Sequence, residues 1–505
     1  MNEKSDRSTH SGLPAANPVI DLGIDFGTTN CTVARVRPDG GIHQQGPVPS
    51  IGALCEDEVF FGEEARDRLL SDSREVVPVR DLKLLLRQDE CTLGDRIWDT
   101  RELVARLLAH LRRLLIGDEP VGMLVVGTPV NIEPAQRDRM REAASRAGFR
   151  DLQFVYEPTA ALLGALDQQE LSREALALVV DWGGGTLDLS VVRHENRLYR
   201  DLDVEGDVAD LGGTLIDEAI TSSLLRGQPH VSKALQRVPQ GFERLKEEVE
   251  LEKIRMLDEL DSQDDPESLP LSGWIAPAWL DEDLQVDSAV VVETLRRFAG
   301  RATQRIETML ERANLRATHI TDVLFAGGTC KARVIREQIA ARFPAARILR
   351  TRNPQLLTGI GCARLLKAGF QLELAADLVV READDHLFTL LPRGIRVELG
   401  SCRCAEFMVT DLNAPEAIFD FGICQVSDNQ RSMRAAGSDG FQSLHQMFIS
   451  AGQPKLKQAG ISERVRLHIG INRNLEVAVH AETQISQCSV QNSIQGVPLA
   501  IRVGT

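Results

Sequence analysis

Two short turns in this chain are built from glycine and threonine, and each follows an apolar segment that ends in aspartate. The turn residues are Gly27, Thr28 and Thr29 in the first, and Gly183, Gly184, Gly185 and Thr186 in the second. Because glycine has no side chain, the backbone N–H groups of such a turn can converge on an anion. One glycine turn alone is commonly just a tight hairpin. Two of them, from opposite sides, could clamp a polyphosphate.

The aspartates that precede the turns, Asp25 and Asp181, indicate a metal ion. A carboxylate at the end of an apolar strand costs free energy unless a cation or hydrogen-bond donors compensate it. Mg²⁺ prefers few protein carboxylates and completes its coordination with waters and phosphate oxygens. Either aspartate alone would be interpreted as a turn cap, but the two together, beside the phosphate-binding turns, favour a Mg²⁺ site.

The segments that carry these residues repeat one pattern. Val19–Val36 and Leu176–Val192 each consist of an apolar strand, an aspartate, a Gly/Thr turn and a second strand. A later strand in each repeat ends in a glycine turn and opens a helix, at Met123–Ala144 and Asp322–Ala340. One unit used twice predicts two lobes that face each other, with a ligand in the crevice between them.

The alternation of short apolar strands and amphipathic helices continues over residues 18–374 and predicts an α/β domain. Its clearest expected helices are Thr100–Ile116, Pro134–Ala147 and Ser288–Asn314. Residues 1–17 are polar and lack periodicity, so they predict a disordered tail. Residues 375–385 are expected to be an interdomain linker.

Residues 386–505 change character and predict a separate β-rich domain. The alternating segments Arg464–Gly470 and Asn474–His480, with asparagines in the turn between them, predict an antiparallel hairpin. Cys402 and Cys404 would point the same way from a strand, but a metal site needs more ligands at suitable spacing. We therefore interpret the two as half-buried strand cysteines.

The composition argues against several classes of function. With 58 basic and 74 acidic side chains the net charge is −16, which is unfavourable for binding a nucleic-acid backbone. No apolar run approaches the roughly 18 residues of a membrane helix, and no signal peptide follows the start, so a soluble, cytoplasmic protein is expected. Nine cysteines, an odd number, fit a reducing compartment better than a disulfide framework.

The motifs also resemble those of a known family. IDFGTTN, DWGGGTLD, YEPTAALLGAL at Tyr156–Leu166 and FAGGTCKARVI occur in the order found in the DnaK-type, seventy-kilodalton heat-shock chaperones. Asp203–Ile220 resembles that family's GD…LGG…D segment, and the resemblance covers about Val19 to Gly369. It implies a duplicated actin-like (ribonuclease H-like) two-lobe ATPase domain, followed by an all-β, sandwich-like domain that binds peptide. The EPTAA element separates these chaperones from sugar kinases and actins of the same superfamily.

The resemblance implies roles for individual residues. The threonines of the first turn would contact phosphate, and the two aspartates would hold Mg²⁺ largely through water. Lys83, which from the residues alone is an ordinary helix-edge lysine, would position or polarise the attacking water, and Glu157 would orient it. Thr186 would contact the γ-phosphate, while Asp188 and nearby backbone groups would help to hold K⁺. The expected catalytic residues are Lys83, Glu157, Asp181 and Thr186.

The nucleoside contacts match the family less closely. The residues implied for this part of the site are Gly212, Gly213, Glu250, Lys253, Gly327, Gly328 and Lys331. Lys331 replaces an arginine beside the adenine, and lysine has no planar head to stack on a base. Leu257 replaces a serine, and Gln355 replaces an aspartate. These departures predict weaker binding of ATP and ADP than in typical members.

The resemblance further implies unfolded or extended peptide, a J-domain cochaperone and a nucleotide-exchange factor as partners. Pro129 and Arg137 match the family's switch proline and relay arginine. Gln153 replaces the basic residue that contacts J-domain proteins, which argues against an ordinary J-protein. Arg381 and Glu382 interrupt the leucine-rich linker of the family. No segment after the last strands is expected to form the family's helical lid, so peptide exchange should be fast.

Two other functions compete with the chaperone interpretation. A nucleotide-switched interaction protein that serves one dedicated partner is the alternative, and promiscuous binding of peptides from a library would distinguish the two. A small-molecule kinase is disfavoured, because the EPTAA element and Lys83 match the chaperones instead of the kinases.

Overall fold

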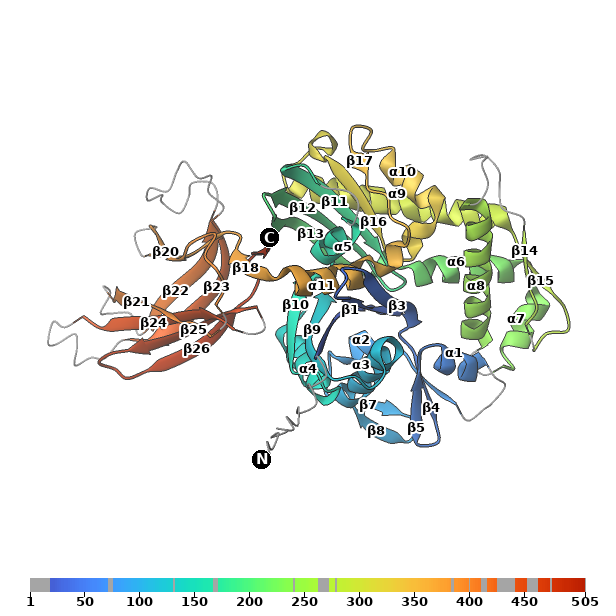
Figure 1. Ribbon diagram of the computed structural model, residues 1–505, viewed down its shortest axis with the longest axis horizontal. Helices are drawn as coiled ribbons and strands as arrows, with labels where there is room; N and C mark the ends of the chain where they lie inside the picture. The colour runs from blue at the N-terminus through green and yellow to red at the C-terminus, as the bar shows by residue number, and fades with distance from the viewer. Residues whose placement is uncertain are drawn as a thin grey trace, which may run out of the picture.

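The computed structural model consists of a large α/β part and a C-terminal β region beside it (Figure 1). The structure describes residues 19–70, 76–129, 132–166, 171–238, 241–261, 272–277, 279–382, 386–398, 400–409, 416–424, 441–451, 462–472 and 475–504. The tail expected at 1–17 lies outside these residues, as does Asn474 of the expected hairpin. Within the described ranges, no helix is long and apolar enough to cross a bilayer.

The first α/β unit is built on a five-stranded sheet with the order β10-β9-β1-β2-β3. β1 lies in the middle, antiparallel to β2 and parallel to β9. Apolar residues such as Leu22 and Ile24 make β1 a buried central strand. The strands are β1 (Ile20–Phe26), β2 (Asn30–Val36), β3 (Ile42–Pro49), β9 (Val121–Thr128) and β10 (Asp151–Tyr156).

The second α/β unit is built on a seven-stranded sheet with the order β17-β16-β11-β12-β13-β27-β18. Its first five strands repeat the order and directions of β10, β9, β1, β2 and β3. The strands are β11 (Glu174–Trp182), β12 (Leu187–Glu195), β13 (Leu198–Val208), β16 (Asp322–Ala326), β17 (Arg347–Ile348), β18 (Phe370–Leu374) and β27 (Leu499–Val503). The repeat seen in the sequence is therefore a repeat of strand topology.

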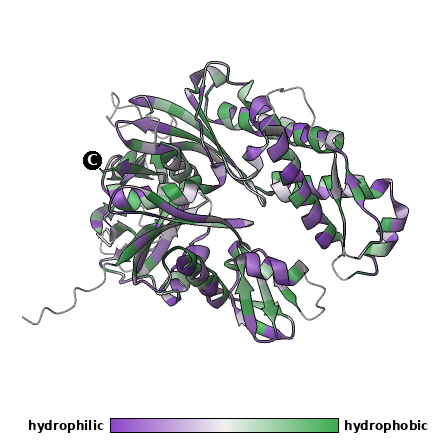
Figure 2. Cartoon of the chain, turned by 45° about the vertical axis from the view of Figure 1, so that its right-hand side comes forward, coloured by the Kyte–Doolittle hydropathy of each residue, from purple (hydrophilic) through white to green (hydrophobic). Residues whose placement is uncertain are grey.

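The helices repeat in the same way. α4 (Pro134–Arg146) and α5 (Glu157–Ala165) follow β9 and β10, as α10 (Arg333–Ala340) and α11 (Leu357–Ala368) follow β16 and β17. α3 (Thr100–Ile116) precedes β9, and α9 (Ser288–Arg312) precedes β16. Each of these two begins after an aspartate cap: Asp99 accepts from the Arg101 N–H, and Asp287 accepts from the Ala289 N–H. The three helices expected from the sequence are confirmed, with small differences at two C-terminal ends. Figure 2 shows polar and apolar residues alternating along the helices.

α5 and α11 cross at glycines and connect the two units. A Cβ on Gly361 would lie 1.8 Å from the carbonyl oxygen of Ala160, and one on Gly164 would lie 2.0 Å from that of Leu357. Only glycine permits backbones to approach so closely. Buried residues of both helices share one core with strands of both sheets, including Val125, Ala161, Val179, Leu324 and Leu365.

Smaller elements extend each unit. The first unit has β4 (Gly52–Cys55), β5 (Glu58–Phe61), α1 (Gly62–Leu70), β6 (Val77–Val79), α2 (Leu82–Leu85), β7 (Glu90–Leu93) and β8 (Arg96–Asp99). The second unit has α6 (Gly213–Arg226), α7 (Pro229–Leu235), α8 (Gly241–Asp261), β14 (Gly273–Ile275) and β15 (Leu284–Val286). An ion pair of 2.6 Å between Arg80 and Glu247 links the two sets.

Two four-stranded sheets form the β region, with the orders β20-β19-β22-β23 and β21-β24-β25-β26. The strands are β19 (Asp377–Arg381), β20 (Leu387–Leu391), β21 (Arg403–Met408), β22 (Glu416–Cys424), β23 (Phe441–Ser450), β24 (Arg464–Ile471), β25 (Val477–Thr483) and β26 (Ser489–Ile494). Alternate residues of both sheets meet in one core, among them Phe421, Met447, Leu467 and Val479. β24 and β25 form the antiparallel hairpin that the sequence predicts.

Two strands differ from the expected domain boundaries. β19 lies within 375–385, the expected linker, and pairs with β20 and β22. β27 lies within 386–505, the expected β domain, but pairs with β13 and β18 in the sheet of the second unit. Arg502 of β27 also forms a 2.5 Å ion pair with Glu373 of β18. The chain therefore passes between the second unit and the β region twice, from β18 to β19 and from β26 to β27.

The two cysteines near the start of β21 also differ from expectation. Cys402 and Cys404 are exposed, and not half-buried. β21 is an edge strand, and these residues lie on the side away from the core that Phe407 contacts. Alternation along an edge strand leaves such a side open to solvent.

Candidate active site

The turn between β1 and β2 meets the turn between β11 and β12 where the two units face each other. A Cβ on Gly184 would lie 2.2 Å from Oγ1 of Thr29, and one on Gly185 would lie 2.9 Å from Cβ of Thr28. Any larger residue would collide with the facing threonine, so glycine permits this approach. Backbone hydrogen bonds from the start of α6 to carbonyl groups of the second turn hold that turn in place.

Asp25 and Asp181 lie one residue before the ends of the central strands β1 and β11, and both residues are half-buried. Burial raises the pKa of Asp25 to about 7, with Glu157 adding to the shift and Lys83 opposing it. Burial, followed by repulsion from Asp25, raises the pKa of Asp181 well above its usual range. Carboxyl groups with raised pKa values gain free energy from a nearby cation when they ionise, and oxygen ligands of this kind suit Mg²⁺.

Lys83 of α2 lies beside Glu157, the first residue of α5. Its Nζ donates to Oε1 of Glu157 at 2.8 Å, and the two side chains are 17% and 8% exposed. Burial by itself lowers the pKa of Lys83, but Glu157, Asp25 and Asp188 more than offset this and raise it above the usual value, so the ammonium stays charged. Asp81, directly before α2, has a left-handed φ of 54°. Non-glycine residues adopt this conformation infrequently, and more often at functional sites.

Thr186 closes the second turn. Its Oγ1 donates to Oδ2 of Asp188 at 2.8 Å, and its carbonyl accepts from the Gly183 N–H at 2.9 Å. Asp188 lies opposite Asp181 in the pairing of β11 with β12 and is buried. The hydroxyl of Thr186 is therefore held between the turn and a buried carboxyl group.

The other end of the site is formed by α6, α8 and the turn after β16. Gly327 has a φ of 80°, and a Cβ there would lie 2.4 Å from the carbonyl oxygen of Trp182, so this turn requires glycine. Lys253 of α8 contacts Oδ1 of Asp217 at 2.5 Å. Burial raises the pKa of Asp217 to about 6, and Lys253 opposes that shift.

One cavity of about 310 Å³ connects these groups. The expected site residues that line it are Asp25, Gly27, Thr28, Thr29, Lys83, Glu157, Asp181, Gly183, Gly184, Gly185, Thr186, Gly213, Glu250, Lys253, Gly327, Gly328 and Lys331. The three departures from the family pattern, Lys331, Leu257 and Gln355, lie on its wall. Gly212 does not line it but packs behind the second turn, where a Cβ would lie 2.3 Å from the carbonyl oxygen of Gly185.

Two further residues of this cavity were not singled out from the sequence. Asp217 is the final aspartate of the GD…LGG…D pattern, and its place in that pattern could have indicated that it belongs to the site. Thr329 donates from Oγ1 to the carbonyl oxygen of Gly183 at 3.1 Å and so joins the two glycine turns of the second unit. A single threonine after a glycine pair gives no signal of its own.

Arg137 of α4 lies where the first unit meets the β region. Its side chain is buried and hydrogen-bonds to Tyr156. Burial lowers the pKa of Arg137, while Tyr156 and Glu476, a residue just before β25, oppose that shift. Leu475 packs against the cores of both the first unit and the β region. Gln153 and Leu475 line a second cavity of about 250 Å³.

Comparison with known proteins identifies relatives of the chain. The family model for the Hsp70 protein matches residues 87–370. Chaperone protein DnaK of Mesomycoplasma hyopneumoniae (strain 232) is 27% identical over 354 residues, which are 68% of this chain and 57% of that protein. Chaperone protein DnaK of Thermosipho melanesiensis (strain DSM 12029 / CIP 104789 / BI429) is 27% identical over 399 residues, which are 75% of this chain and 64% of that protein. The chain thus spans less than two thirds of the length of either relative.

The match and the repeated strand topology define the class of this protein: its α/β part has the actin-like ATPase fold. Because the family model covers more than half of the chain, the chain belongs to the Hsp70 family. At 27% identity to both relatives it is a divergent member.

Proposed function

We propose that this chain binds Mg·ATP between its two α/β units, hydrolyses it slowly, and uses the nucleotide state to control binding of extended peptide by the β region. The observation that carries the proposal is the buried Lys83–Glu157 ion pair of 2.8 Å. It lines the same cavity as both strand-end aspartates and both glycine turns. Phosphoryl transfer depends mainly on positioning and electrostatic stabilisation, and this cavity has groups for both.

Each residue has a distinct part in the proposed hydrolysis. Asp25 and Asp181 would hold Mg²⁺, which supplies positive charge to the phosphates when bound. The charged Lys83 would stabilise the developing negative charge and position water, and Glu157 would accept a hydrogen bond from that water. Thr186 would bind the terminal phosphate through its hydroxyl, with Asp188 beside it contributing to a K⁺ site.

The two α/β units would act as lobes that close on nucleotide. The facing glycine turns come from different units, so a polyphosphate held by both would favour the closed arrangement. The crossing of α5 and α11 joins the units through one core and would be the hinge.

Closure of the lobes would be transmitted to the β region, which consists of two packed sheets. The contacts at Arg137 and Leu475 would transmit it. Pro129 directly follows β9 and is buried. It lies four residues before Glu133, the N-cap of α4, the helix that contains Arg137. Arg137 contacts Tyr156, the neighbour of Glu157, and lies within electrostatic range of Glu476. A shift of Glu157 on nucleotide binding would therefore be transmitted to the β24–β25 hairpin. Peptide would bind the β region by strand pairing and apolar pockets.

The test is binding of ATP by calorimetry with and without Mg²⁺, together with release of phosphate. We expect tighter binding with Mg²⁺, hydrolysis to ADP and phosphate, and no phosphate on added metabolites. Asp181→Ala should weaken Mg·ATP binding by about tenfold or more, since it removes a charged donor to the metal. Asp283→Ala, at an exposed position of the same unit, is the matched control and should bind as wild type does. Equal affinity with and without Mg²⁺ would contradict the proposed metal site.

A further inference from the structure

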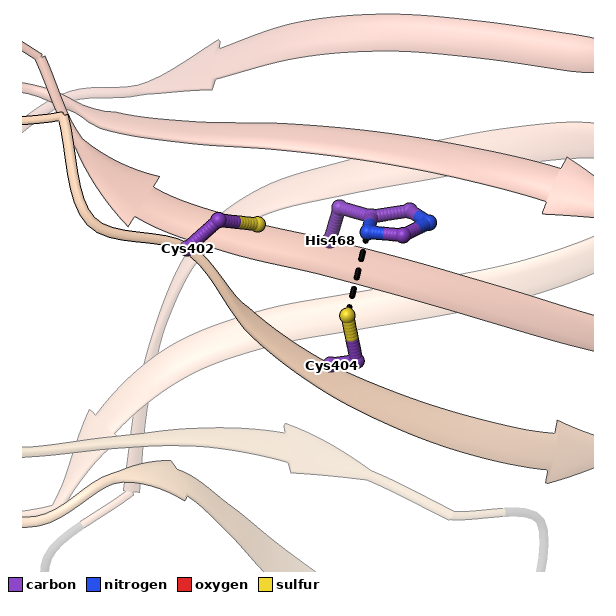
Figure 3. Close-up of side chains that lie close together, drawn as sticks. All are labelled: Cys402, Cys404 and His468. Atoms are coloured by element: carbon purple, nitrogen blue, oxygen red, sulfur yellow. Dashed lines mark hydrogen bonds between the residues drawn. The ribbon is translucent and has the colours of Figure 1, made fainter.

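Three potential metal ligands meet on the outer side of the β region (Figure 3). Cys404 of β21 lies directly opposite His468 of β24 in the strand pairing. Cys402, two residues earlier, points to the same side. Gly470 of β24 packs against the backbone just before Cys402, where a Cβ would lie 2.3 Å from the carbonyl oxygen of Ser401, so glycine permits this close approach. The cluster therefore combines two exposed thiols with one half-buried imidazole.

The separations of the ligand atoms suit one small ion. Sγ of Cys404 lies 3.1 Å from Nδ1 of His468, and the three ligand atoms all lie within 4.8 Å of one another. Tetrahedral zinc, with bonds of about 2.3 Å to sulfur and about 2.0 Å to nitrogen, keeps its ligand atoms about 3.5–3.8 Å apart. Small rotations of the exposed Cys402 and Cys404 side chains would be needed to reach that geometry.

A second observation orients the imidazole toward a metal. Nε2 of His468 contacts Oε1 of Glu482 on β25 at 3.1 Å. When Nε2 carries the proton and donates to this carboxylate, the lone pair of Nδ1 faces the thiols. Carboxylates hold metal-binding histidines in this way in many sites. The ring of His480, stacked on His468 with centroids 5.8 Å apart, restricts its rotation further.

A disulfide between Cys402 and Cys404 is less favourable than metal binding. Residues two apart in a strand are separated by about 6.6 Å between Cα atoms. That is the upper end of the range of about 4.4–6.8 Å that disulfides tolerate, so this bond would be strained. A metal ion bridges thiolates without drawing them into bonding contact.

We propose that Cys402, Cys404 and His468 bind a borderline-soft divalent cation of the zinc class, with Glu482 positioning His468. Two thiolates balance the charge of the ion, and three protein ligands leave a fourth position for water or an exogenous ligand. Thiolate ligands select against Mg²⁺, so this site is distinct in chemistry from the aspartates of the nucleotide cavity. The bound ion would fasten the edge strand β21 to β24 and stabilise the β region. This inference does not rest on the proposed ATPase activity.

The test is zinc binding to the reduced full-length chain in excess Mg²⁺, measured by competition with a chromophoric chelator. We expect one tight site per chain, a higher unfolding temperature with Zn²⁺, and thiolate-to-metal charge-transfer absorption when Co²⁺ replaces Zn²⁺. Glu482→Gln should weaken binding about tenfold or more, because it removes the carboxylate that supports the imidazole. The double variant C402S/C404S and the variant His468→Ala should each lose the tight site.

Cys488→Ser is the matched control, since it removes a thiol from the same region outside the cluster, and it should bind zinc as wild type does. Circular dichroism of each variant without metal checks that the fold is retained. Absence of tight zinc binding in the reduced wild type, equal affinity in the double variant, or a Co²⁺ spectrum without thiolate absorption would each overturn the proposal.

Discussion

Lys83 and Glu157 lie 74 residues apart in sequence and 2.8 Å apart in space, and both side chains are largely buried. An ammonium in such a place is held by its carboxylate neighbours, and burial without them would favour its neutral form. A fixed positive charge beside the two glycine turns is what stabilisation of a phosphoryl-transfer transition state requires.

Lys83→Ala is expected to keep nucleotide binding and to lose hydrolysis. Loss of one fixed group that stabilises transition-state charge typically lowers turnover by about 10²–10³-fold. Single-turnover hydrolysis and calorimetric affinity for ATP would separate the two effects. Lys233→Ala, an exposed lysine of α7, serves as the control and should hydrolyse ATP normally. Unchanged turnover in Lys83→Ala would refute the role given to Lys83.

Asp25→Asn should stabilise the protein in the absence of nucleotide and Mg²⁺, and more so at high pH. The carboxyl of Asp25 has an ordinary pKa of 3.8 in the unfolded chain and a pKa of about 7 in the folded protein. Because the folded value is higher, the stabilising contribution is fully present below 3.8 and is lost as pH rises through 7. The gap between these values corresponds to at most about 4 kcal/mol.

Asparagine cannot ionise, so the variant avoids that loss. We expect its unfolding temperature to exceed that of wild type clearly at pH 8 and much less at pH 5. Asp283→Asn, at an exposed site, should show no such trend. A difference between Asp25→Asn and wild type that is the same at both pH values would contradict the assignment.

Residue types and their neighbours were enough to predict the two aspartates and the two glycine turns, because these have local signatures. The role of Lys83 was available only through the family resemblance, since nothing in the residues around it marks it, and its ion pair with Glu157 was not predicted. The partner of Cys404 could not be predicted either. His468 is 64 residues away, and only the strand register brings the two together.

Among the elements, the crossing of α5 and α11 has very close backbone packing, which a single substitution can test. Gly361→Ala would place a Cβ 1.8 Å from the carbonyl oxygen of Ala160, so the helices would have to move apart. We expect a loss of stability on the order of 3 kcal/mol, as for other overpacked cores. Urea unfolding would measure it.

Gly300→Ala is the matched control, because Gly300 is also inside a helix but its nearest neighbour, Gln338, would lie 3.5 Å from the new Cβ. There the better helix propensity of alanine should be neutral or stabilise by up to about 1 kcal/mol. Equal effects of the two substitutions would mean that the crossing is not tightly packed.

Helices and central strands were predictable because each has its own periodicity. The departures concern β19 and β27, whose short apolar sequences do not show which sheet they join. β19 follows β18 after only two residues, and for this reason the sequence was interpreted as a linker there. β27 pairs with residues of β13 that lie 300–304 positions earlier, and no local pattern encodes that choice.

At the scale of the whole molecule, the side chain of Leu475 packs against two cores at once. Its φ of 62° is left-handed, which is a costly conformation for leucine and indicates that the contact is held by its surroundings. Leu475→Asn keeps a residue that tolerates this backbone and removes the apolar contact. On the proposed function, we expect ATP hydrolysis to persist while the ratio of peptide affinities with ATP and with ADP falls several-fold.

Fluorescence anisotropy of a labelled peptide in the two nucleotide states measures that ratio. Ile485→Asn is the control, because Ile485 is an exposed residue in the next turn of the β region. A ratio unchanged by Leu475→Asn would show that coupling takes another route. Absence of peptide binding by the wild type would instead favour a single dedicated partner.

The position of β27 between β13 and β18 sets an order of assembly while the chain is being made. Synthesis runs from the N-terminus, so β13 and β18 leave the ribosome well before residues 499–503. Until then β13 presents an unpaired edge, the part of a sheet most prone to pair with a wrong strand. The second unit therefore completes its own sheet only after the whole β region has been synthesised. Over that interval the nascent chain is exposed to misassembly that the finished molecule no longer permits.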